Sequence, residues 1–265
     1  MKYLCFLVFC TFFPVIVLGQ NVHLANQDLD ALFTSDVTTM SEFRERLNKC
    51  VDFKDSLPMD QRVRGLLALF NRSSGAVNAK QGIVKSFVEE LLNNSHTIAF
   101  NDSEWYAEVI CSIKYKGKQN NLQIILKPEL LDTNIFRWAI CGVSGLREAG
   151  ILNKTALGYI DPIDNELNFL DMDSRLQKDY KNAFGYKASD AKISQLSIFL
   201  FLLQEHQITI EFVDKVKYHF LNVPKYVFIV EFNSTPMNSG WLISDISKLS
   251  DQGKKLYENT LFGNY

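Results

Sequence analysis

The carboxylates between residues 161 and 173 are the densest set of metal-type ligands in the chain. They are Asp161, Asp164, Glu166, Asp171 and Asp173. Hard cations such as calcium bind several oxygens that converge from one loop. The segment lacks the glycine that the tight turn of a helix–loop–helix calcium site requires, and apolar residues recur at every second or third position. We therefore interpret it as an extended, solvated segment and predict no metal, with a calcium site as the alternative.

Nitrogen and sulfur ligands show no metal spacing either. Zinc needs closely placed histidine or cysteine pairs, and the histidines are far apart, at His23, His96, His206 and His219. Nucleophile elbows, phosphate-binding loops and dinucleotide fingerprints are also missing from the sequence. These patterns predict no catalytic residues and no cofactor.

The cysteines are predicted to be free and buried rather than part of a disulfide framework. Beyond the first 19 residues the chain has Cys50, Cys111 and Cys141, too few for such a framework. Cys111 and Cys141 fall in predicted strands, where a free cysteine usually acts as a small buried hydrophobe. A disulfide between two of the three is the alternative in an oxidising compartment. No histidine is close to them in sequence, so a nucleophilic role is not favoured.

Composition indicates a globular protein, and the N-terminal residues indicate that it is exported. The chain has 265 residues, 47% apolar and 22% charged, with a formal net charge of −2, so it provides no basic surface for nucleic acid. Residues 1–19 combine Lys2, an apolar run and Gly19 before Gln20, which is typical of a cleavable signal peptide. The alternative, a membrane anchor, would need about 20 apolar residues. We predict a secreted or periplasmic protein without a later membrane span.

The elements follow from periodicity. Helical spacing predicts helices from Ser41 to before Asp55, from Pro58 to Phe70 and at 80–93. Period-two alternation then predicts strands at 105–116, 122–127 and 135–143, with Pro128 ending the second. A helix at 190–205 and strands at 208–220, 226–232 and 241–246 repeat this order. The polar tail after Ser250 is expected to dock loosely or fray.

The closing strands of the two halves share the pattern W-x-I-x-x-[V/I]. It is carried by Trp138 and Ile140 in one copy and by Trp241 and Ile243 in the other. Because a helix and two strands precede each copy in the same order, we predict a duplicated α+β unit. The predicted domains are residues 20–150 and 151–265, and the tryptophans are expected to be core residues.

This order of helices and antiparallel strands, ending in the tryptophan pattern, resembles the nuclear transport factor 2-like (cystatin-like) superfamily. It is similar in particular to tandem arrangements in uncharacterised secreted bacterial proteins. The resemblance implies an α+β fold of two units, each with helices packed on a curved antiparallel sheet. It covers residues 36–146 well and 155–250 less well, because the second half has no equivalent of the two N-terminal helices.

The resemblance also implies the alternative function. Some members are isomerases or dehydratases with a carboxylate or histidine base inside the cone. Here the predicted inward faces are apolar, whereas Glu108 is expected to be solvated, with Lys217 and His219 on the opposite face.

We therefore predict a non-enzymatic protein that binds an unknown protein or a small apolar ligand. Three tyrosines are expected to be exposed and to contribute to that surface: Tyr106, Tyr159 and Tyr226. The protein is expected to be a monomer with an internal pseudo-dimer.

Overall fold

The computed structural model describes residues 36–52, 57–102, 104–132, 135–152, 176–178, 180–181, 186, 194–234 and 238–262. The predicted signal peptide, the acidic segment at 161–173 and Tyr159 lie outside these residues. The fold is mixed α+β, as predicted.

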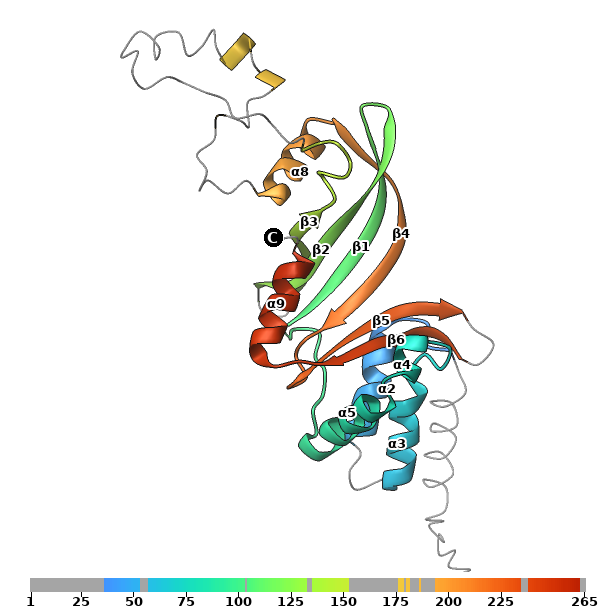
Figure 1. Ribbon diagram of the computed structural model, residues 1–265. Coiled ribbons are helices and arrows are strands. Elements are labelled where there is room, and N and C mark those ends of the chain that lie inside the picture. The colour runs from blue at the N-terminus through green and yellow to red at the C-terminus, as the bar shows by residue number, and fades with distance from the viewer. Residues whose placement is uncertain are drawn as a thin grey trace, which may run out of the picture.

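The strands form one open antiparallel sheet of six strands, in the order β3-β2-β1-β4-β5-β6 (Figure 1). Their bounds are β1 Trp105–Tyr115, β2 Lys118–Asp132, β3 Ile135–Ser144, β4 Ile208–Phe220, β5 Tyr226–Ser234 and β6 Ser239–Lys248. The helices are α2 Met40–Asp52, α3 Met59–Ala68, α4 Gly75–Asn78, α5 Gln81–Asn94, α8 Gln195–Gln204 and α9 Asp251–Leu261. All six predicted strands are present, and β2 and β6 are longer than predicted.

The two three-stranded meanders join through β1 and β4. Ala107 lies opposite Tyr218 at this seam, and two register shifts follow further along the pair. β4 pairs with β5 only over Lys217–Phe220. Figure 1 shows the consequence, because β4 follows β1 for most of its length and diverges from β5. The sheet is therefore continuous but forked.

One face of the sheet carries both helical layers, and we call it the helical face. Near its β5–β6 end, Phe87 of α5 packs against Tyr226 and Phe228 with ring centroids 5.3 and 5.2 Å apart. At the other end, Phe199 and Leu202 of α8 share a core with residues of the first meander: Cys111, Ile113, Leu122, Ile124 and Val143. Helices from each half of the chain thus cover strands from the other half. The predicted domain division near residue 150 stays a prediction.

The opposite face is covered by α9, so we call it the α9 face. Ser250 caps this helix by accepting a hydrogen bond from Gly253 N at 3.2 Å. Leu261 and Phe262 pack on a small cluster that includes Tyr106 and Ile125. The expectation that the tail frays is wrong for residues 251–262, because they form a capped helix with apolar contacts at its end and polar contacts along it.

The outer edge of β6 is joined to the N-terminal part of the described chain. Trp241 N donates to Val37 O at 2.8 Å, and Val37 N donates to Ser239 O at 3.2 Å. Gly240 between them has φ +105°, and a Cβ there would lie 2.1 Å from Val37 O. This close approach requires glycine.

Pro128 lies inside β2 instead of ending it. It pairs with Trp138 of β3, whereas the pairing of β2 with β1 stops at Leu126 and Ala107. Proline cannot donate a ladder hydrogen bond, so it is tolerated where the pairing with one neighbouring strand has stopped. The prediction that the strand ends at Pro128 is therefore wrong.

In the part of the chain that the structure describes, no helix has the length and apolar character required to span a bilayer.

Candidate functional site

The tyrosines predicted to be exposed are buried where the structure describes them. Tyr106 is 5% exposed and Tyr226 is 2% exposed. The Tyr106 hydroxyl donates to the Glu258 carboxylate of α9, and the Tyr226 hydroxyl donates to Ser86 Oγ of α5 at 2.9 Å. The expected exposure of both is wrong, because α9 and α5 cover them.

The two isoleucines among the predicted repeat markers lie on one row across the whole sheet. Ile140 pairs with Leu126, and the row of paired residues continues through Ala107, Tyr218 and Val230 to Ile243. The two isoleucines therefore occupy the two ends of one row, each two positions from the seam pair Ala107–Tyr218. Trp138 and Trp241 precede them by two residues in antiparallel strands, so they lie on opposite sides of the row.

Both tryptophans pack on the same tyrosine. The Tyr218 ring centroid lies 6.2 Å from that of Trp138 and 5.1 Å from that of Trp241. Trp105, which is almost fully buried, contacts Trp138 at 4.9 Å. The pair thus forms part of an aromatic cluster on the helical face, with each tryptophan half-buried.

The α9 face contains a polar cluster that we define as Glu108, Lys217, His219 and Tyr257. His219 Nε2 lies 3.0 Å from Glu108 Oε2, and His219 Nδ1 lies 2.6 Å from the Tyr257 hydroxyl. Lys217 Nζ lies 3.3 Å from the same carboxylate oxygen. His219 is 3% and Glu108 6% exposed.

The chemistry of its groups limits which atoms of the polar cluster donate and which accept. An ionised carboxylate only accepts, so His219 Nε2 donates to Glu108, whereas the hydroxyl of Tyr257 can either donate to or accept from His219 Nδ1. Burial opposes ionisation of Glu108, but the hydrogen bond and charge of His219, with Lys217, keep its pKa below the ordinary value. Burial first, then the charge of Glu108, raises the pKa of Tyr257.

The polar cluster corrects one prediction and confirms another. Glu108 is not solvated, because α9 covers it, whereas Lys217 and His219 do lie opposite the helical face. A hydroxyl, an imidazole and a carboxylate in line are groups used in acid–base catalysis. Here they satisfy one another beneath α9, so the cluster acts as an anchor for that helix.

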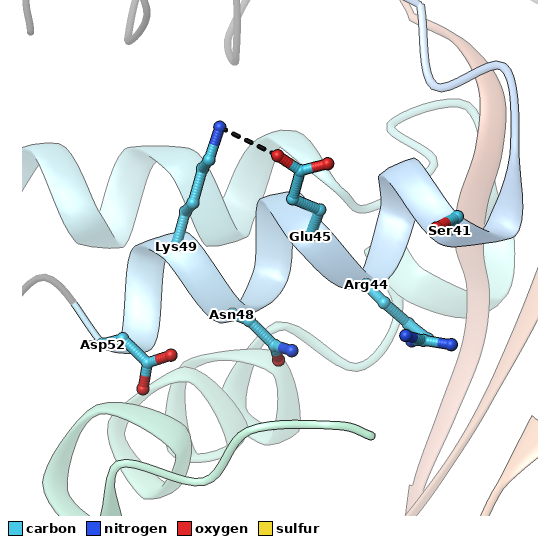
Figure 2. A pocket seen from close by; sticks show the side chains of 6 residues that line it. All are labelled: Ser41, Arg44, Glu45, Asn48, Lys49 and Asp52. Carbon is cyan, nitrogen blue, oxygen red and sulfur yellow. Dashed lines mark ion pairs between the residues drawn. The ribbon is translucent and has the colours of Figure 1, made fainter. Parts of the chain in front are cut away.

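The surface of α2 has a shallow depression of about 370 Å³ (Figure 2). Several of its lining side chains already make contacts within the fold. The Asn48 amide bonds to both backbone groups of Ile98, at 2.9 and 2.8 Å, and Lys49 pairs with Glu45 at 3.1 Å. Arg44 lies over the Phe100 ring at 5.5 Å. In Figure 2 the labelled side chains spread along the helix and do not converge on one point.

The groove between α3, α4 and α5 is the better concave site, with a volume of about 680 Å³. Ligand pockets typically have volumes of roughly 300–1,000 Å³ and predominantly apolar walls. The floor is apolar and buried: Phe70, Val77, Val84, Val88 and Leu92. One wall is a row along α3 at i, i+4 and i+8, formed by Met59, Val63 and Leu67. Met59 is 54% and Leu67 38% exposed.

The apolar row on α3 is separate from the stripe of this helix that faces the core. Leu66 faces the core together with Arg62, whose guanidinium donates to Cys50 O and Val51 O at 2.7 and 2.8 Å. Met59, Val63 and Leu67 form the second stripe, which faces α5. The wide apolar face of α5 is divided in the same way, with Phe87 on the sheet and Val84 and Val88 in the groove.

Metal ligands do not gather in the described residues, where no group of three or more histidines, cysteines and carboxylates could hold an ion. Cys50, Cys111 and Cys141 are free thiols. Burial raises the pKa of Cys50 and of Cys141 to about 11.

Sequence reasoning missed both the groove and the polar cluster. The apolar spacing of Met59, Val63 and Leu67 was the available signal for the groove. No comparable signal joined Glu108 to Tyr257, which are far apart in the chain. Comparison of the chain with protein-family models, with curated proteins and with solved structures gives no match.

Proposed function

We propose that the protein is an exported, non-enzymatic binding protein that holds a small apolar ligand in the groove between α3 and α5. The observation that carries the proposal is the apolar row of Met59, Val63 and Leu67, in which Met59 and Leu67 are exposed, beside a buried apolar floor. Covering these side chains would stabilise a complex by roughly 25 cal/mol for each Å² of apolar surface removed from water.

A small ligand suits this groove. The volume of about 680 Å³ lies within the range of small-ligand pockets. A hydrocarbon chain in the groove would contact Val84 and Val88 on the floor. Export rests on the predicted signal peptide at residues 1–19.

An isomerase or dehydratase is the weaker proposal. Such a site would place an acid or base among apolar walls. Among the described strands, the buried polar side chains are Glu108, Ser112 and His219, and all three alternate away from the helical face. They also lie far in the fold from the groove, on the face that α9 covers.

The two-unit architecture remains part of the proposal. The row from Ile140 to Ile243, with a tryptophan two residues before each end, supports a duplicated unit related by a two-fold axis at the Ala107–Tyr218 pair. In this proposal the edge-to-edge joining of β1 and β4 is the internal pseudo-dimer, and the protein is a monomer.

Titration with the neutral fluorescent probe N-phenyl-1-naphthylamine tests the binding function. The wild-type protein should enhance its fluorescence saturably. Leu67→Glu places a charge on the groove wall and should weaken binding about tenfold or more, equivalent to about 1.4 kcal/mol. Leu256→Glu is the matched control, because Leu256 is an exposed leucine of α9. The proposal is wrong if the wild-type protein shows no saturable binding of the probe. It is also wrong if both variants bind the probe with the same affinity as the wild-type protein.

A further inference from the structure

The charges that line the groove lie mainly at one end. α3 leads through the short α4 directly into α5, so the end of α3 and the start of α5 lie together. The lining residues of this end include Arg72 before α4 and Lys85 in α5, with the amides of Asn78 and Gln81. The carboxylate of Glu89 follows Lys85 by one turn.

Neither cation is neutralised in the described part of the chain, where no ion pair joins Arg72 or Lys85 to another residue. Lys85 precedes Glu89 by four residues, and this order of charges gives a weaker helical pair than the reverse. Two cations therefore face the groove against one carboxylate.

The position of Arg72 is fixed by its neighbours. Asn71 N donates to Ile243 O at 2.9 Å, and Ser74 Oγ donates to Ser244 O at 2.8 Å, so β6 holds the loop on both sides of Arg72. Asn78 Nδ2 also donates to Arg72 O at 3.1 Å. The loop that presents the guanidinium at the groove is therefore anchored to the sheet.

We infer that the ligand is a single-chain amphiphile with an anionic head, such as a carboxylate. Its chain would lie along the row of Met59, Val63 and Leu67, and its head would lie between Arg72 and Lys85. The ten residues of α3 rise about 15 Å, which sets the length of chain that the wall can cover. Arg72 can bind a carboxylate with two hydrogen bonds. This inference rests on the proposed function.

Displacement of N-phenyl-1-naphthylamine by three compounds with the same chain tests the inference: dodecanoate, dodecanol and dodecyltrimethylammonium, each below the concentration at which it forms micelles. Dodecanoate should bind about tenfold or more tightly than dodecanol, and the cation most weakly. The preference should shrink as salt is added, because the cations are exposed and screened. An Arg72→Gln, Lys85→Gln double variant should bind dodecanoate and dodecanol alike and still bind the neutral probe.

The matched control for charge is Arg64→Gln, Lys118→Gln, which removes two exposed cations outside the groove and should preserve the preference. Equal affinity for dodecanoate and dodecanol in the wild-type protein overturns the inference but leaves the apolar groove intact as a binding site. Failure of the wild-type protein to bind the neutral probe overturns the proposed function as well. Closure of the groove by a second copy, seen as a dimer that Leu67→Glu dissociates, also overturns the inference.

Discussion

His219 of β4 places its Nε2 3.0 Å from Oε2 of Glu108 in β1, across the seam that joins the two meanders. Both side chains are buried, so removing one partner leaves the other uncompensated. Glu108→Ala should lower the free energy of unfolding by about 3–5 kcal/mol, measured by urea denaturation.

The control for that change is an exposed ion pair. Arg64 and Asp60 lie 2.6 Å apart with side chains 65% and 68% exposed. Arg64→Ala should change the free energy of unfolding by less than about 1 kcal/mol. Equal effects of the two substitutions would contradict the anchoring role of the polar cluster.

Low pH should destabilise the folded protein because Glu108 becomes protonated. Because the pKa of Glu108 is lower in the folded state than its ordinary value, ionised Glu108 stabilises the fold at pH values above the unfolded-state pKa, about 4.3. This contribution is lost as the pH falls through the folded-state pKa. In urea denaturation at a series of pH values, the free energy of unfolding should fall less at low pH for Glu108→Gln than for the wild-type protein. An unchanged pH profile in the variant would exclude Glu108 as a source of the acid sensitivity.

Gly240 should be the least replaceable residue of the tryptophan strand. A Cβ at this position would lie 2.1 Å from Val37 O, and its φ is +105°. Gly240→Ala should therefore lower the free energy of unfolding by at least about 1–3 kcal/mol, as measured by thermal or urea denaturation. Gly75→Ala is the control, because a Cβ there meets no atom within 4 Å. Similar stability of the two variants would refute the close approach of Val37 to β6.

The cysteines should react slowly in the folded protein. The pKa of Cys50 and of Cys141 is about 11, and burial also raises the pKa of Cys111, so little thiolate is present at neutral pH. An aromatic disulfide reagent should modify the three thiols slowly in the folded protein and rapidly in denaturant. Rapid reaction of one thiol in the folded protein would instead indicate an activated cysteine.

Local patterns predicted the elements, and distant contacts decided how they pack. Alternation from Trp105 to Tyr115 and the spacing of Val84, Phe87 and Val88 identified a strand and a helix, since both patterns depend on neighbours in the chain. The pairing of Ala107 with Tyr218, which joins the two meanders in one sheet, depends on residues more than a hundred positions apart. No periodicity encodes it.

The candidate sites also combine local patterns, which the sequence shows, with distant contacts, which it does not. The stripe of Met59, Val63 and Leu67 can be read from the sequence, but its exposure depends on how α3 is rotated against α5. Tyr106 and Glu108 were predicted to face solvent because they alternate with the inward-facing residues of their strand. The tail beyond Ser250 forms α9, and its Tyr257 and Glu258 bury both residues through contacts that composition does not predict.

Photo-crosslinking with an apolar diazirine probe, followed by peptide mapping, locates the bound ligand. If the ligand binds in the groove, the labelled peptides come from α3 and α5, at or beside Met59, Val63, Leu67 and Val88, and dodecanoate suppresses the labelling. Labelling confined to the aromatic cluster around Trp138 and Trp241, or labelling that dodecanoate does not suppress, would contradict binding in the groove.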